Sequence, residues 1–392
     1  MSSATSESRD TRVVVLSQFI TAFSWTYVYI FLPFYIQQIS PYERGGTLMW
    51  TGWILGITGI ASTVFAPIWG GMAAKVSPKR LYETGMLVQA GFMVLMGFTR
   101  SLPVLLLIRL LIGCVGGLST IALIIMMSAS SAREKITGNI GLFQAALTSG
   151  QIAGPIAGAF SAELIGYRGT FLVGGALMLV AFAHVHLSLS RVSRFRPELP
   201  QPAHSRRGLA AGRLLCFAAS IQIAFMPSVL PEILAGLRIA QTEAVRTAGL
   251  IVFAYGVTSV LGSFYLSRLA IFQGRHRTLL WVTVGASGLQ LLLGATGSVT
   301  TFGLVRMLQV GLIAAVIPIV FAEVAASAHG RVIGFMNTSR FASYAAGPLI
   351  ATAAFAHASP FGLYLGLSIF TLLALVLFLR ERADAAALAP SP

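Results

Sequence analysis

The sequence predicts an all-α integral membrane protein with twelve transmembrane helices in two six-helix, pseudo-symmetric bundles. Of its 392 residues, 56% are hydrophobic and only 10% are charged, whereas an ordinary soluble domain has about 25% charged residues. Apolar runs of about 20 residues, long enough to cross a bilayer of about 30 Å, recur along the whole chain. A pattern of small residues in one half also returns in the other half, which indicates an internal duplication.

The expected spans fall into two sets of six, separated by one long polar stretch. Their apolar runs are continuous, which argues against a large transmembrane barrel, whose strands alternate apolar and polar residues over about 10 positions. The first six spans are expected at 13–36, 48–71, 81–99, 102–127, 138–161 and 169–190. The second six are expected at 213–235, 246–267, 279–296, 301–325, 332–356 and 361–379.

The polar stretch 191–212 is rich in arginine and proline and is expected to be a cytoplasmic linker. It divides the chain into an N-terminal bundle, 1–190, and a C-terminal bundle, 213–392. With the N-terminus inside, nineteen Lys and Arg residues fall in cytoplasmic segments and five in outer loops, so we expect both termini in the cytoplasm of a cell inner membrane. The net charge of +15 is therefore a topology signal, and it does not indicate a nucleic-acid partner.

The repeated pattern is a strip of small residues on the fifth expected span. Residues four apart on a helix stay near one face, so glycines at this spacing let another helix approach closely. Proline inside such a helix is tolerated where neighbouring helices compensate. The strip consists of Gly141, Gly150, Gly154, Pro155 and Gly158, and 193 residues later the eleventh span carries Gly334, Ser343, Gly347, Pro348 and Ala351. We interpret both strips as packing seams.

The glycine strip resembles the fifth-helix signature of drug:proton antiporters in the major facilitator superfamily. Arg109–Gly113, followed by Gly116-Gly117, resembles their fourth-helix motif, and Gly70–Arg80 resembles their loop motif between the second and third helices. The loop departs from the family pattern at Ala74, where the family usually has Asp, and at Ser77, where it usually has Gly. The resemblance implies the major facilitator fold, transport by alternating access, and a role for Arg109 in proton coupling.

Polar and aromatic side chains at helical spacing are the candidate substrate-binding residues. They form a stripe on the first span, while two arginines add positive charge deep in the tenth and eleventh spans. Aromatic walls with few polar groups suit flat or amphipathic organic ligands, and hydrogen bonding between helices is the alternative role for each position. The candidates are Gln18, Thr21, Trp25, Tyr29, Gln144, Gln222, Arg306, Gln309, Arg340 and Tyr344.

The proton carrier is the hardest role to assign, because the only aspartates, Asp10 and Asp384, lie in the terminal segments. Proton antiport needs a group that changes its protonation inside the membrane. Glu232, near the outer end of the seventh span, and Glu323, near the inner end of the tenth, are candidates, with pairing to a loop arginine as the alternative. Arg109 is the third candidate, and its alternative role is to brace a helix break by binding backbone carbonyls.

The sequence shows no P-loop, nucleophile elbow, dinucleotide fingerprint or metal-ligand cluster. We therefore expect a protein that is not an enzyme and holds no metal or cofactor. We also expect it to be a monomer. The leading hypothesis is a secondary active, proton-coupled exporter of small amphipathic or hydrophobic organic compounds, of the multidrug type, acting within the lipid bilayer. Two alternatives remain open: a facilitator or importer of a neutral or anionic metabolite, and a membrane sensor or scaffold without turnover.

Overall fold

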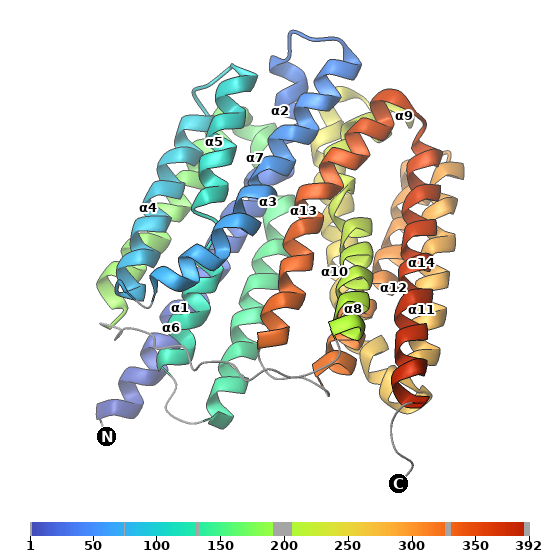
Figure 1. The fold of residues 1–392 in the computed structure, drawn as a ribbon. Coiled ribbons are helices and arrows are strands. Elements are labelled where there is room, and N and C mark those ends of the chain that lie inside the picture. Colours follow the sequence, from blue (N-terminus) through green and yellow to red (C-terminus); the bar gives the residue numbers. More distant parts are fainter. Residues whose placement is uncertain (1, 74, 130–132, 191–205, 326–330, 388–392) are drawn as a thin grey trace. The chain divides into compact units, whose positions relative to one another are not determined.

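The computed structural model describes residues 2–73, 75–129, 133–190, 206–325 and 331–387, so Ala74 and residues 191–205 of the expected linker lie outside it. The described chain is helical and contains no strand (Figure 1), which confirms the all-α prediction. The first seven helices are α1 (Ser2–Tyr29), α2 (Leu32–Ile39), α3 (Arg44–Met72), α4 (Pro78–Met96), α5 (Leu102–Cys114), α6 (Leu118–Ala129) and α7 (Arg133–Ser188). The others are α8 (Arg206–Ala224), α9 (Met226–Gly236), α10 (Gln241–Gln273), α11 (Arg275–Leu292), the short 3-10 helix η1 (Leu293–Ala295), α12 (Val299–Ala325), α13 (Arg331–His357) and α14 (Pro360–Ala387).

Nine helical stretches within the described residues are long and apolar enough to cross a membrane. One of them, Gly141–Ser188, is 48 residues long and covers most of the fifth and the sixth expected spans. It bends at Gly166, where φ is 71°, a left-handed conformation that glycine adopts most readily. Helix therefore covers all or most of each expected span, and one glycine separates two of them.

Three expected spans are broken by short irregular segments. The first divides between α1 and α2 at residues 30–31, the fourth between α5 and α6 at 115–117, and the seventh between α8 and α9 at Phe225. Pro33 and Pro227 lie in the first turns of α2 and α9, where a missing N–H is tolerated. The carbonyls one turn earlier lose a donor, so each of these two breaks leaves backbone acceptors free for side chains. The continuous apolar runs do not reveal these breaks.

The described residues form two compact units, and the first is drawn from 1–41, 57–198 and 240–253. In it, α1 packs along α7, and α4 packs on α6 and α7. The core between these helices contains Tyr82 and Met86 of α4, which are fully buried. The buried apolar side chains thus hold the helices of the first unit together.

The second unit is drawn from 42–56, 199–239 and 254–392. Helix α8 packs on α12, α13 and α14, and α11 packs on α12 and α14. Leu215 of α8, Val282 of α11 and Phe378 of α14 are fully buried in the shared core. Helix α8 is central to the second unit, and this places its polar side chains deep inside the unit.

The internal duplication extends to cross-helix hydrogen bonds. In the first unit, the hydroxyl of Ser62 on α3 donates to the carbonyl of Gly113 on α5 at 3.3 Å. In the second unit, the hydroxyl of Ser263 on α10 donates to the carbonyl of Ala314 on α12 at 3.1 Å, and the residues of each pair are 51 apart. Matching helices of the two halves are therefore joined at matching positions, as expected for a chain built from two structural repeats.

Candidate functional site

The glycine strip on α7 packs against α1 and forms a close backbone seam. A Cβ added at Gly150, Gly154 or Gly158 would lie within 2.7 Å of a backbone carbonyl oxygen of α1. At Gly158 that oxygen belongs to Tyr27, and the added atom would overlap it. Gly141, at the start of the same strip, has nothing within 4 Å of such an atom. The seam therefore depends on three glycines, spaced one turn apart, rather than on the whole motif.

The second copy of the strip, on α13, packs on the break between α8 and α9. A Cβ added at Gly347 would lie 3.1 Å from the backbone nitrogen of Phe225. This contact is looser than the contacts of the first strip, in line with the loss of glycine at Ser343 and Ala351. The two copies thus occupy equivalent places but do not pack equally closely.

The prolines of the two strips are each approached by a glycine from another helix of the same unit. A Cβ added at Gly249 of α10 would lie 3.1 Å from the carbonyl oxygen of Pro155, and one at Gly52 of α3 would lie 3.3 Å from that of Pro348. Small residues on a facing helix allow such close backbone approach. Each strip therefore has two helical neighbours.

Arg109 on α5 is buried beside the aromatic side chains of the first expected span. Only 2% of it is exposed, and its guanidinium carbon lies 4.8 Å from the centre of the Trp25 ring and 5.9 Å from that of Tyr29. A cation over an aromatic face is attracted by about 2 kcal/mol when both are desolvated. The backbone carbonyl of Arg109 also accepts a hydrogen bond from Thr58 on α3 at 2.9 Å. The structure therefore places the arginine of the fourth expected span beside the aromatic stripe of the first expected span.

The other two candidates on α1 make contacts between helices. Gln18 is fully buried and donates from Nε2 to the hydroxyl of Ser119 on α6 at 3.0 Å. The hydroxyl of Thr21 lies 3.9 Å from the sulfur of Met178 on α7. These contacts match the alternative role of helix packing, whereas Trp25 is half-buried and remains available as a wall for a ligand.

Arg306 on α12 anchors a second, fully buried polar network. Its guanidinium donates to Oε1 of Gln309 at 2.7 Å and to the backbone carbonyl of Gln222 on α8 at 2.9 Å. Gln309 donates to Oε1 of Gln222 at 2.7 Å, and Gln222 donates to the hydroxyl of Thr371 on α14 at 2.7 Å. Arg306, Gln309, Gln222 and Thr371 are all 0% exposed, so three helices share one set of hydrogen bonds.

The break between α8 and α9 explains why an arginine lies here. Pro227 has no N–H, so the carbonyl of Ile223 lacks the donor that a continuous helix would supply. Arg306 donates to this carbonyl at 3.3 Å, and a cation is also favoured at the negative end of a helix. The rings of Phe225 and Tyr255 complete its surroundings, with centres 5.2 Å and 5.1 Å from the guanidinium carbon.

Three further candidates are not joined to these networks by hydrogen bonds within the described residues. Gln144 is exposed on α7, Arg340 is half-buried on α13, and Tyr344 is 40% exposed on α13. Tyr344 lies in the surroundings of Tyr255, whose ring faces Arg306. Of the three, only Tyr344 is brought close to a buried arginine.

Both candidate coupling carboxylates are paired with arginines near the ends of helices. An oxygen of Glu232 lies 2.6 Å from Nε of Arg44, and an oxygen of Glu323 lies 3.1 Å from a guanidinium nitrogen of Arg275. The second oxygen of Glu323 lies 3.8 Å from His276. This arrangement matches the alternative role proposed from the sequence, an interfacial carboxylate paired with a basic residue.

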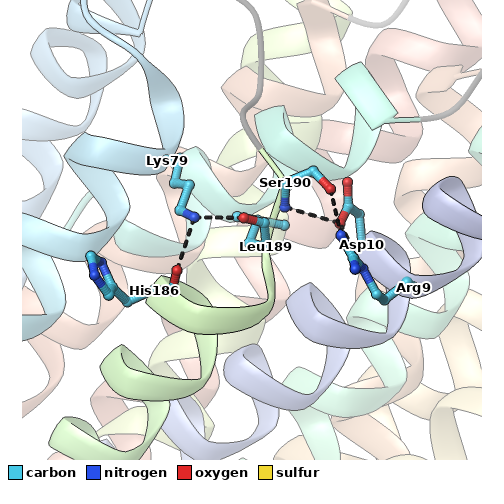
Figure 2. Close-up of polar contacts among 6 residues, drawn as sticks. All are labelled: Arg9, Asp10, Lys79, His186, Leu189 and Ser190. Atoms are coloured by element: carbon cyan, nitrogen blue, oxygen red, sulfur yellow. Dashed lines mark hydrogen bonds and ion pairs between the residues drawn. The ribbon is translucent and has the colours of Figure 1, made fainter.

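Lys79 of the loop motif binds the last turn of α7 (Figure 2). Its ammonium group donates to the carbonyls of His186 at 3.1 Å and Leu189 at 2.5 Å. A cation here meets carbonyls without helical partners at the negative end of the helix. Asp10 on α1 accepts a hydrogen bond from the backbone of Ser190 at 3.1 Å. The start of α4 and the first turns of α1 are therefore both tied to the end of α7.

We expect Lys79→Met to destabilise the protein by about 1–2 kcal/mol, because the carbonyls at the end of α7 lose a charged donor. Thermal unfolding of purified protein in detergent measures this loss. Arg80→Met is the matched control, since Arg80 is the exposed neighbour and its loss removes the same charge. Equal unfolding temperatures for the two variants would contradict the anchoring role of Lys79.

A cavity of about 890 Å³ opens in the first unit where α2, α4 and the bend of α7 meet. Its lining includes Tyr35, Tyr167, Arg100, Arg168 and Glu163. Charges of both signs and side chains that are largely exposed line it, so it lacks the one-sided charge of a site that selects cations or anions.

The sequence profile described as Major Facilitator Superfamily matches residues 14–215, which is more than half of the chain. The chain belongs to this superfamily. The family expected from the glycine strip is thus confirmed, and with it the expectation of a membrane transporter rather than an enzyme. A transporter of this family is a multi-pass membrane protein that moves a small-molecule substrate across the bilayer.

Several curated relatives are named Multidrug resistance protein MdtG. The relative from Citrobacter koseri is 31% identical over 189 residues, which cover 48% of this chain and 46% of the relative. The relative from Klebsiella pneumoniae is 30% identical over 170 residues, which cover 43% of this chain and 41% of the relative. The matched region thus covers less than half the length of each of these two relatives.

Solved structures of transporters share the fold over almost the whole chain. A bacterial homologue of the human lysosomal transporter Spinster, in an inward-facing and occupied conformation, matches with a TM-score of 0.81 at 12% identity, covering 98% of this chain and 99% of the other. The human organic anion transporter MFSD10 matches with a TM-score of 0.69 at 17% identity, covering 95% and 99%. At these identities the likeness shows the fold alone.

Several residues that contact the candidate side chains were not candidates from the sequence. Ser119 and Thr371 are ordinary hydroxyl residues in apolar runs, and nothing in the linear pattern marks them as partners of Gln18 and Gln222. Phe225 had a visible signal, because it stands two residues before Pro227 in a predicted span. Lys79 lies in the recognised loop motif, but its acceptors are backbone carbonyls, which leave no trace in the sequence.

Proposed function

We propose that this chain is a secondary active transporter that exports small amphipathic or hydrophobic organic compounds in exchange for protons. The observation that carries the proposal is the stacking of Arg109, in the segment that resembles the fourth-helix motif of drug:proton antiporters, on Trp25 and near Tyr29. The buried cation, Arg109, is the coupling element of the proposal. The rings of Trp25 and Tyr29 beside it offer a surface that suits a flat ligand. The names of the MdtG relatives support multidrug-type export.

Within this proposal, Trp25 and Tyr29 contact substrate and Arg109 couples its movement to protons. An arginine keeps its charge, so Arg109 acts by changing the proton affinity of a neighbouring group or of the substrate. Glu232 and Glu323 are weaker coupling candidates, because each is already paired with a basic residue. The Arg306 network contributes a second polar surface in the other unit.

The proposed cycle is alternating access about the linker, with bundles 1–190 and 213–392 rocking against each other. The glycine strips are the seams that keep close-packed helices together during this movement. Both termini face the cytoplasm of a cell inner membrane, and the monomer is the working unit.

Cysteine labelling tests the orientation of the termini. Cysteines are introduced at residues 4 and 390 and treated with a membrane-impermeant reagent, in intact cells and in inside-out vesicles. Labelling only in the vesicles agrees with cytoplasmic termini.

Substrate-dependent proton movement in inside-out membrane vesicles tests the proposed exchange. Vesicles energised by respiration become acidic inside, and an acridine dye reports the pH gradient. Addition of a transported compound is expected to dissipate part of the gradient in vesicles with the wild-type chain but not in vesicles without it. A broad panel of amphipathic compounds that leaves the dye signal unchanged, in vesicles that contain folded protein, would contradict proton exchange.

A facilitator of an anionic metabolite is the second candidate, favoured by the charge of Arg306, for which the described residues provide no carboxylate. The two candidates differ in energy source. Downhill flux of an anion that is unaffected when the pH gradient is collapsed would support the facilitator over the exporter.

A further inference from the structure

The guanidinium of Arg306 is partnered only by neutral groups in the described part of the chain. Its hydrogen-bond partners include the side chain of Gln309, the backbone carbonyls of Gln222 and Ile223 and the hydroxyl of Tyr255. Its Nε atom is buried and has no hydrogen-bond partner. A full positive charge at 0% exposure with an unmet donor is costly. An acceptor that carries negative charge is the missing partner.

Two carboxylates of the second unit are already in ion pairs elsewhere. Glu232 pairs with Arg44, and Glu323 pairs with Arg275 and His276. The only aspartates of the chain are Asp10 and Asp384, in the terminal segments. A cationic ligand near Arg306 would therefore be repelled without compensation, whereas an anionic ligand would supply the absent charge.

The walls around Arg306 are aromatic. Phe225 and Tyr255 face its guanidinium, and Tyr364 lies in the same surroundings. Tyr344, near Tyr255, is the exposed member of the group. Because Arg306 is 0% exposed, a ligand reaches the unmet donor only when neighbouring side chains move. Flat apolar bodies suit such walls.

We infer that the substrates of this transporter are organic anions with a flat apolar body, and that Arg306 receives their anionic group. This inference rests on the proposed function, because it names the substrate class of the same transporter. The amide side chains of Gln309 and Gln222 hold the guanidinium in place without neutralising it. Arg306 thus selects the charge of the ligand, and the aromatic rings select its shape.

Three naphthalene compounds of similar size and different charge test this inference: 2-naphthoate, 2-naphthamide and 2-naphthylmethylammonium. Ligand-induced thermal stabilisation of the purified protein measures binding, and flux in proteoliposomes measures transport. The wild-type protein is expected to bind and move 2-naphthoate about tenfold better than the amide, equivalent to about 1.4 kcal/mol. Stronger binding of the ammonium compound than of 2-naphthoate would overturn the inference.

Three variants test the role of Arg306 itself. Arg306→Gln is expected to bind 2-naphthoate and the amide equally, while Arg306→Lys retains part of the preference. Gln309→Glu supplies a carboxylate to the guanidinium and is expected to abolish the preference with Arg306 still in place, so it decides the question if Arg306→Gln fails to fold. Arg268→Gln is the matched control, because Arg268 is exposed and stacks on Phe264, and it is expected to keep the full preference.

The binding and flux measurements separate this inference from the proposed function. Binding of 2-naphthoate that is lost in Gln309→Glu, together with no outward flux of any probe, would support the anion site and contradict export. Outward flux of the amide or the ammonium compound in preference to 2-naphthoate would support export and overturn the inference. A folded Arg306→Gln protein that keeps the preference for 2-naphthoate would also overturn it.

Discussion

Replacing Gly158 by alanine is expected to destabilise the protein by about 3 kcal/mol, at the upper end of the usual cost of overpacking. The added methyl group would overlap the carbonyl oxygen of Tyr27 on α1, and a backbone oxygen has no alternative rotamer. Helices α1 and α7 must therefore separate along the seam, which weakens every contact between them. Thermal unfolding in detergent measures the loss, and size-exclusion chromatography shows how much protein remains monodisperse.

Gly141→Ala is the matched control for this prediction. It makes the same change in the same motif, but nothing lies within 4 Å of the added Cβ. Alanine favours a helix over glycine by about 0.8–1 kcal/mol, so the control is expected to unfold at the same temperature as the wild type or slightly above it. A Gly158→Ala protein as stable as its control would show that α1 and α7 do not pack as described.

Replacing Arg109 by glutamine is expected to reduce proton-driven export about 30-fold, because a desolvated contact between a cation and an aromatic ring contributes about 2 kcal/mol. The charge beside Trp25 and Tyr29 is lost, while the carbonyl of Arg109 can still accept from Thr58. Substrate flux under an imposed pH gradient measures coupling, and exchange of labelled for unlabelled substrate without a gradient measures the movement of the carrier.

The two flux measurements distinguish coupling from bracing. A coupling role predicts that Arg109→Gln loses gradient-driven flux but keeps exchange, and that Arg109→Lys, which keeps the charge, retains part of both. A bracing role predicts that Arg109→Gln loses both activities together with thermal stability. Full gradient-driven flux in Arg109→Gln would contradict any part for Arg109 in coupling.

The sequence predicts the fold well because its dominant signals are local. Apolar runs locate the spans, and glycines four residues apart on α7 predict a packing seam from helix geometry alone. The identity of the partner helix is not local, since a strip of small residues can accept any helix. The contact with Tyr27 on α1 therefore emerges only in the folded chain. The helix breaks are hard to locate for a related reason: the residues around Phe225 are as apolar as an unbroken span, and Pro227 is the one visible signal of that break.

The candidate site is only partly readable from the sequence. The spacing of Arg306 and Gln309 on one helix predicts their contact, and the hydrogen bond between them is present. The remaining acceptors of Arg306 are backbone carbonyls at the break after α8. Every residue has a carbonyl, so no residue type identifies the one that binds. Lys79 illustrates the same limit, because its contacts at the end of α7 are also with carbonyls.

Outward flux in proteoliposomes under an imposed pH gradient tests the central claim, that this superfamily member is a proton-coupled exporter, most directly. Purified protein is reconstituted, a labelled amphipathic compound is followed across the bilayer, and an ionophore that exchanges protons for potassium ions collapses the gradient in a parallel sample. We predict accumulation of the compound on the acidic side, against its own gradient, and loss of this accumulation with the ionophore. Flux that only equalises the concentrations, with or without the pH gradient, would contradict proton-coupled export.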